Sequence, residues 1–130
     1  METCYIVAER FSSADFLHGP IAMVGSSFPV FLFTPGGVTW TSMHQILDKL
    51  RDAGAEMLLI TDRSNPDAID LGLRTVCIPA RLTHTGPLPE EVFTPIPYIV
   101  PAQLFAAALA QEKGLNPDQP RGLSKVTRTL

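Results

Sequence analysis

The stretch "SFPVFLFTPGGVTWTSMHQILDKLRDAGAEMLLITD", residues 27–62, decides the fold of this chain. Its two ends, residues 27–35 and 55–62, are continuous apolar runs of the kind found in strands buried on both faces of a sheet. Between them, residues 41–54 carry apolar side chains at the i, i+3, i+4, i+7 spacing of an amphipathic helix, namely Met43, Ile46, Leu47 and Leu50. Gly54 follows as a helix stop. This β-α-β alternation predicts a parallel sheet with right-handed crossovers.

The sequence after this stretch continues the same pattern. Residues 75–80, "TVCIPA", predict a third buried strand, in which Cys77 serves as a small hydrophobe. Residues 95–114, "PIPYIVPAQLFAAALAQEKG", predict a helix that is rich in alanine, with its prolines near the start. The small side chains of this helix suit close contact with a core or with a partner. The expected fold class is therefore α/β.

The N-terminal segment contains two predicted helices. Residues 2–11 contain good helix formers and the apolar residues Tyr5, Ile6 and Ala8, and we expect a first helix there. Ser12 or Ser13 can cap a second, short helix that ends before the Gly19–Pro20 break. The chain thus begins within a predicted helix, with no strand before it.

Length and composition restrict the class of protein. The 130 residues fit one domain, and the formal net charge of −3 supplies no broad basic face for nucleic acid. The apolar runs are under ten residues, which is too short to span a membrane. We expect neither nucleic acid nor membrane as a partner.

Cysteine and histidine are too sparse for a disulfide framework or a metal centre. Cys4 and Cys77 form no CxxC motif, and no signal peptide is present, so we expect a cytoplasmic location. His18, His44 and His84 lie far apart without other ligand residues nearby, so we expect no metal and no cofactor.

The C-terminal segment differs in charge from the rest of the chain. Residues 121–130 hold Arg121, Lys125 and Arg128 and no acidic residue, whereas all 13 acidic residues precede them. Three such charges are more typical of a solvated chain end than of an arm that binds phosphate.

Three side chains and one turn are candidates for chemistry, each with an ordinary alternative. Glu2 is also a solvated terminal acid, and Lys125 is also a surface amine. His18 precedes the Gly-Pro break, where its ring could be exposed at a helix end. The turn "TPGGVTWT", residues 34–41, could cradle an anion with backbone N–H groups, but it lacks a P-loop lysine and a dinucleotide fingerprint. A plain strand-to-helix turn is the better interpretation.

Two segments together carry a more specific signal. "ETCYIVAERFSSADFLHGPIAMV", residues 2–24, and "DQPRGLSKVTRTL", residues 118–130, resemble the second sugar-isomerase (SIS) domain of the glucosamine-6-phosphate synthase family and its related deaminases and isomerases. The resemblance covers nearly the whole chain. It implies a three-layer sandwich with a mainly parallel sheet flanked by helices, over residues 1–120, and a tail, residues 121–130, that closes over the site.

The resemblance also implies roles for three residues. Lys125 matches the lysine that forms a Schiff base with the open-chain keto sugar. Glu2 matches the carboxylate that moves a proton between C1 and C2, and His18 matches a histidine that assists ring opening from the neighbouring subunit of a dimer. A lysine on a tail can reach a site and exclude water from it, with Arg121 helping to anchor the tail.

The implied activity is that of the C-terminal half of a sugar-phosphate isomerase or aminotransferase, of the fructose 6-phosphate to glucosamine 6-phosphate type. The implied partners are a hexose phosphate, another SIS domain and a second copy of the chain. The alternative is a sugar-phosphate-binding or dimerisation module without catalysis. An imine-forming lysine favours the enzyme, since a sensor does not need one.

Two features depart from the family pattern. The serine- and threonine-rich loop that holds phosphate in the first SIS domain has no counterpart here, so we expect the chain alone to be incomplete. The family domain also starts with a strand and most of a helix that precede residue 2 of this chain. We therefore expect the sheet to lack its first strand, leaving an edge for a partner.

Overall fold

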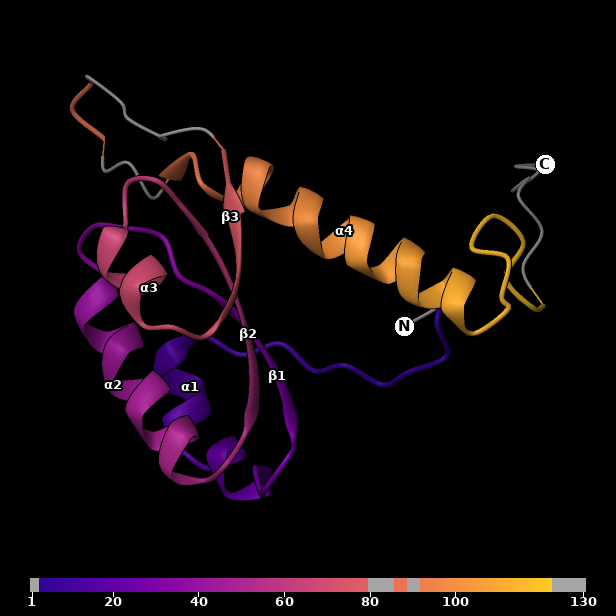
Figure 1. Cartoon of the computed structure of the whole chain (residues 1–130), viewed down its shortest axis with the longest axis horizontal. Coiled ribbons are helices and arrows are strands. Elements are labelled where there is room, and N and C mark those ends of the chain that lie inside the picture. Colours follow the sequence, from indigo (N-terminus) through magenta and orange to yellow (C-terminus); the bar gives the residue numbers. More distant parts are fainter. Residues whose placement is uncertain (1–2, 80–85, 89–91, 123–130) are drawn as a thin grey trace, which may run out of the picture. The chain divides into compact units, whose positions relative to one another are not determined.

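The computed structural model describes residues 3–79, 86–88 and 92–122 of the chain (Figure 1). These residues belong to two compact units. The larger unit is Phe11–Pro101, and the smaller one combines Met1–Arg10 with Ala102–Leu130. Helix α4, Pro95–Glu112, contributes residues to both.

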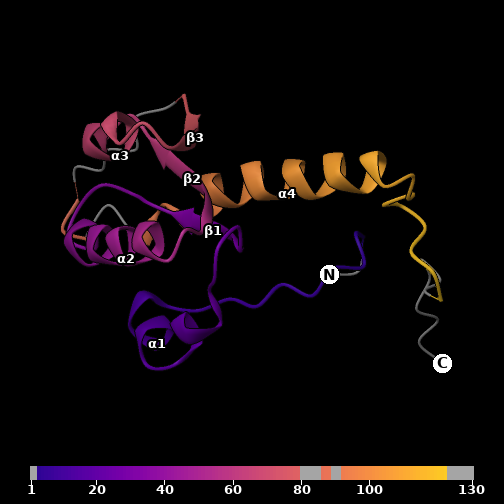
Figure 2. The ribbon, with the colours of Figure 1, turned by 60° about the horizontal axis from the view of Figure 1, so that its bottom comes forward.

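The larger unit is built on a parallel sheet of three strands, β1 (Pro29–Phe33), β2 (Glu56–Asp62) and β3 (Arg74–Ile78). The strand order is β1-β2-β3, and both pairs are parallel (Figure 2). This confirms the parallel α/β architecture. The absence of a first strand stays a prediction.

Two helices connect the strands, and the longer one is α2, Trp40–Asp52. Before the sheet come α1 (Ser13–Leu17) and the 3-10 turn η1 (Pro20–Met23). Ser12 caps α1 as expected, because its hydroxyl accepts the N–H of Asp15 at 3.1 Å. Between β2 and β3, α3 (Pro66–Asp70) begins with a proline after the cap residue Asn65.

The core lies between α2 and one face of the sheet. Three side chains of α2 are at most 2% exposed, namely Ile46, Leu47 and Leu50. They pack against side chains on one face of the sheet, namely Leu32 of β1 and Met57 and Leu59 of β2. Burying one such side chain contributes about 1.5–3 kcal/mol. The i, i+3, i+4, i+7 pattern of the sequence therefore identified the face of α2 that holds the domain together.

The opposite face of the sheet carries the start of α4. The ring of Tyr98 lies 6.5 Å from that of Phe33, centroid to centroid, and its hydroxyl reaches Asp62 at the end of β2. Helical residues therefore contact both faces of the sheet, as the three-layer prediction required.

Two expectations about local structure were wrong. Residues 6–11 are neither helix nor strand, and Tyr5 has a φ of +51°, which no right-handed helix allows. The β-branched residues Ile6 and Val7 weaken an isolated short helix, which is marginal in any case. Cys77 is exposed, whereas Cys4 is buried. Strand β3 lies at an edge of the described sheet, so only the central strand β2 is largely buried.

The smaller unit joins the second half of α4 to residues 3–10 and to the segment after the helix. Helix α4 ends at Glu112, and the turn after it contains Gly114, whose φ of +66° suits glycine at this position. The N–H of Leu115 donates to the carbonyl of Ala110 at 2.8 Å and closes the last turn. No helix in the described part of the chain is both long and apolar enough to cross a bilayer.

Candidate functional site

The three predicted site residues are covered unequally by the structure. Glu2 and Lys125 lie outside the described residues. His18 follows α1 as its C-cap, and its backbone N–H donates to the carbonyl of Asp15 at 3.1 Å. Its side chain is exposed, as expected for a residue before the Gly-Pro break. The grouping of these three side chains stays a prediction.

Tyr5, three positions after Glu2, and Arg121, four positions before Lys125, are in contact. Within the smaller unit, the backbone N–H of Arg121 donates to the hydroxyl of Tyr5 at 2.6 Å. The guanidinium carbon of Arg121 also lies 5.1 Å from the centre of the Tyr5 ring, which is cation–π geometry. Arg121 therefore fastens the start of the tail to the segment that follows Glu2.

A second contact joins the same two segments. The amine of Lys113, just after α4, donates to the carbonyl of Cys4 at 2.7 Å. The Cys4 thiol in turn donates to the carbonyl of Ala106 within α4 at 3.0 Å. Cys4 is 6% exposed, so it anchors the N-terminal segment as a buried side chain.

The carboxyl edge of the sheet, where open α/β sheets bind their ligands, carries a buried polar network. The carbonyl of Thr34, just after β1, accepts from the Thr61 hydroxyl at 2.7 Å and from the Asn65 side-chain amide at 3.1 Å. Asn65 also accepts the N–H of Ala68 at 3.2 Å and so caps α3. This network ties the turn after β1 to the turn after β2.

Asp62, the last residue of β2, is fully buried and accepts hydrogen bonds from two donors. Its carboxylate accepts the N–H of Ser64 at 2.6 Å and the hydroxyl of Tyr98 at 2.6 Å. Burial raises the pKa of the Tyr98 phenol, and the hydrogen bond to Asp62 raises it further. No buried side-chain nitrogen or oxygen among the described residues lacks a partner. The network therefore supports the edge of the sheet, and within the described residues it leaves no buried side-chain donor free for a ligand.

Little in the sequence indicates this network. Thr34 directly follows one apolar run, and Thr61 and Asp62 follow another. A polar residue at the carboxyl end of a buried strand is a usable signal. The partnership of Asp62 with Tyr98, 36 residues away, has no local signature.

We expect the Tyr98 phenol to make the folded state less stable at alkaline pH. Its pKa is raised in the folded state above the ordinary value near 10, so the folded protein keeps a proton that the unfolded chain releases above that pH. The free energy of unfolding should therefore fall as the pH rises above about 10. Tyr98→Phe should lower stability by about 1–2 kcal/mol at pH 7 and make the alkaline decline shallower. Urea unfolding between pH 7 and pH 11 measures both effects, and equal declines in both proteins would refute this explanation.

The glycine turn between β1 and α2 has a packing explanation. A Cβ on Gly36 would lie 3.0 Å from both the carbonyl oxygen and the hydroxyl oxygen of Ser64, so the two turns approach each other too closely for a side chain. Gly37 has a φ of +109°, and Thr39 makes no side-chain cap bond to α2. These contacts favour a plain strand-to-helix turn, as the sequence suggested.

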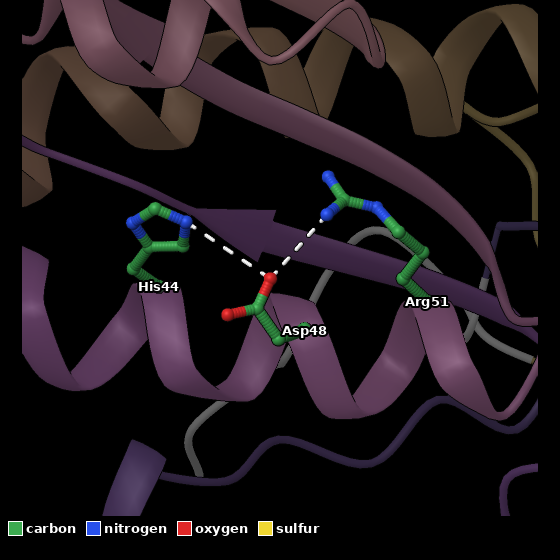
Figure 3. A network of polar contacts seen from close by, with 3 residues as sticks. All are labelled: His44, Asp48 and Arg51. Carbon is green, nitrogen blue, oxygen red and sulfur yellow. Dashed lines mark hydrogen bonds and ion pairs between the residues drawn. The ribbon is translucent and has the colours of Figure 1, made fainter.

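The exposed face of α2 carries a second polar group. Asp48 lies 3.3 Å from Arg51 and 4.0 Å from His44, all on one helix (Figure 3). The His44 ring also lies 5.3 Å from the Trp40 ring, centroid to centroid and tilted by 31°, beside a shallow open depression along the helix. All three side chains of the ion-pair group are 44–57% exposed, and such pairs contribute about 0–1 kcal/mol. We assign this group no chemical role.

No cluster of three or more metal-ligand residues occurs in the part of the chain that the structure describes.

Comparison with known proteins identifies the class of domain. No protein-family model matches the chain. The fold matches the C-terminal domain of glucosamine-fructose-6-phosphate aminotransferase from Francisella tularensis with a TM-score of 0.76. The match has 22% sequence identity and covers 90% of this chain and 31% of that one. The fold is that of an SIS domain, an open parallel α/β sheet with helices on both faces.

Sequence comparison finds similar proteins among the glutamine–fructose-6-phosphate aminotransferases. The chain is 37% identical over 125 residues to glutamine–fructose-6-phosphate aminotransferase (isomerizing) from Pyrococcus horikoshii. It is 31% identical over 128 residues to the protein of that name from Leifsonia xyli. These matches cover 95% of this chain but only 19–20% of the relatives. The chain thus spans about a fifth of the length of these relatives, and its fold is that of the C-terminal domain of one such enzyme.

Proposed function

We propose that this chain is the C-terminal half of a sugar-phosphate isomerase or aminotransferase, acting on an open-chain hexose phosphate such as fructose 6-phosphate. The observation that carries the proposal is the contact between Tyr5 and Arg121. It holds the segment after Glu2 against the segment before Lys125, which are the two residues that the chemistry needs close together. The similarity to isomerising aminotransferases over 95% of the chain supports the same assignment.

The proposed chemistry starts at Lys125. Its amine adds to the C2 carbonyl of the keto sugar, and loss of water leaves an imine. Ammonia then displaces the lysine amine and leaves a free imine at C2. This imine withdraws electrons and makes the C1 proton more acidic, so that the carboxylate of Glu2 can remove it and return it at C2, which gives the 2-amino aldose. His18 assists opening of the sugar ring before these steps, from the second copy of a homodimer. Its exposed position at the end of α1 leaves the imidazole accessible for that role.

The proposed partners follow from the surface of α4. The helix is apolar on all sides, and Ile96, Ile99, Val100 and Leu104 are between 46% and 79% exposed. A helix that is hydrophobic all round is normally buried. We assign this surface to contacts with another SIS domain of the same enzyme and with the second copy in a homodimer. The other SIS domain also supplies the phosphate-binding loop. We place the enzyme in the cytoplasm, where both free cysteines would stay reduced.

Deuterium exchange into the sugar tests the proposal. Fructose 6-phosphate in D₂O should lose its C1 proton signal in the presence of the chain together with the preceding part of a homologous aminotransferase. Glu2→Gln should slow this exchange by about 100-fold or more, because it removes the base that takes the proton. Proton NMR of the sugar follows the reaction.

Glu9→Gln is the matched control, since Glu9 is an exposed carboxylate in the same N-terminal segment. It should leave the exchange rate unchanged. Equal exchange in the Glu2→Gln and unmodified proteins would contradict the assigned base. Binding of the sugar phosphate without any exchange would favour a sensing or dimerisation module.

A further inference from the structure

Helix α4 contains a proline at the boundary between the two compact units. The larger unit ends at Pro101, and the smaller unit resumes at Ala102. Both residues lie inside α4, which continues unbroken to Glu112 (Figure 1). The chain also crosses between the units after Arg10, where residues 6–11 are neither helix nor strand. Pro101 therefore lies at the point where a helix joins the two units.

A proline weakens a helix at a defined position. Pro101 has no N–H, so it cannot donate to the carbonyl of Pro97 four residues earlier, and its ring crowds that carbonyl. Proline also disfavours a helical backbone at the residue before it, here Val100, whose branched side chain adds to the effect. Sharp bends in helices almost always occur at such positions. The turn between Pro97 and Pro101 is thus where bending α4 costs least.

The part of α4 before this turn is held by the larger unit. Tyr98 is 3% exposed, and its hydroxyl donates to the carboxylate of Asp62 at 2.6 Å. Its ring also lies 6.5 Å from that of Phe33, centroid to centroid. Asp62 and Phe33 belong to strands of the sheet, so the first turn of α4 is fixed on the larger unit.

The part of α4 after this turn is held by the smaller unit. The carbonyl of Ala106 accepts the thiol of Cys4 at 3.0 Å, and Ala110 is fully buried. Between the two anchored parts, Val100 and Leu104 are 48% and 66% exposed. Packing therefore restrains the helix less around Pro101 than on either side of it.

We propose that Pro101 is a hinge at which α4 bends, so that the smaller unit moves as one piece. The contacts of Cys4 with Ala106 and of Tyr5 with Arg121 lie within the smaller unit, so bending at Pro101 leaves them intact. The N-terminal segment and the segment after α4 therefore move together. Hinge motions of this kind take microseconds to milliseconds. The hinge does not depend on the function proposed above.

The distribution of distances between the units, measured by double electron–electron resonance on the full chain, tests this proposal. One spin label is attached to Cys77, which is exposed on β3, and the other to Glu112→Cys at the exposed end of α4. Cys4 is buried and stays unlabelled, which peptide mass confirms. Pro101→Ala supplies the missing N–H and should narrow the distribution about twofold, because a helix with all its hydrogen bonds resists bending.

Pro97→Ala is the matched control. Pro97 lies in the first turn of the same helix, where an N–H has no partner within the helix, so this change should leave the width unchanged. An unchanged width in Pro101→Ala, or equal narrowing in Pro97→Ala, would overturn the hinge. A shifted mean distance at constant width would indicate a fixed bend, and it would overturn the hinge as well.

Amide hydrogen exchange, followed residue by residue by NMR, gives a second readout. The N–H groups of Ala102, Gln103 and Leu104 make the helical hydrogen bonds that span the hinge. Pro101→Ala should slow their exchange about tenfold and leave that of residues 108–110 unchanged. Equal slowing along the whole of α4 would show general stabilisation of the helix, which contradicts a local hinge.

Discussion

Asp62→Ala is expected to lower the free energy of unfolding by about 2–4 kcal/mol. The carboxylate is fully buried and accepts two hydrogen bonds of 2.6 Å, from the N–H of Ser64 and the hydroxyl of Tyr98. Its removal leaves both donors without an acceptor in a site closed to water. The start of α4 also loses its polar attachment to the sheet. Urea unfolding at pH 7 measures the effect.

A double-mutant cycle identifies the cause. Tyr98→Phe in the Asp62→Ala background should cost less than it does alone, because the phenol no longer has a hydrogen bond to lose. Asp70→Ala provides the control, since it removes an exposed carboxylate at the end of α3 in the same unit. It should change stability by less than about 0.5 kcal/mol. Additive effects of the Asp62 and Tyr98 substitutions would contradict a direct interaction.

The sequence predicts the larger unit best where one local pattern determines both structure and burial. The spacing of Ile46, Leu47 and Leu50 identified the buried face of α2, and all three residues are at most 2% exposed. The apolar run before Asp62 identified β2, which lies between two other strands. Hydrophobic burial is the dominant force at these positions, and it acts on the side chain itself.

The sequence fails where the neighbours of a segment decide its state. Strand β3 has the composition of a buried strand, but it is an edge strand of the described sheet, and Cys77 is exposed there. Residues 3–11 have helix-forming composition, but a helix of this length gains little from propensity alone. The contacts of Cys4 with α4 and of Tyr5 with Arg121 favour a different backbone.

The candidate site depends even more on distant partners. The Tyr5 hydroxyl and the Arg121 N–H are 116 residues apart in the chain. Nothing in the local sequence of either residue indicates the other, and Tyr5 itself looked like an apolar residue of a helix. The roles of Glu2, His18 and Lys125 came from resemblance to a family, because single acids, histidines and lysines have no pattern that distinguishes catalysis from the solvated surface.

The most direct test of the account is whether Lys125 forms an imine with fructose 6-phosphate. The chain, alone and together with the preceding part of a homologous aminotransferase, is treated with the sugar and borohydride, and its intact mass and peptides are then measured. We predict one reduced sugar adduct on Lys125 that disappears in Lys125→Ala and persists in the control Lys49→Ala. Lys113 should stay unmodified, although it belongs to the same unit. An adduct on Lys49 or Lys113 instead, or no adduct even with the other part supplied, would contradict the assignment of this chain as the imine-forming half of the enzyme.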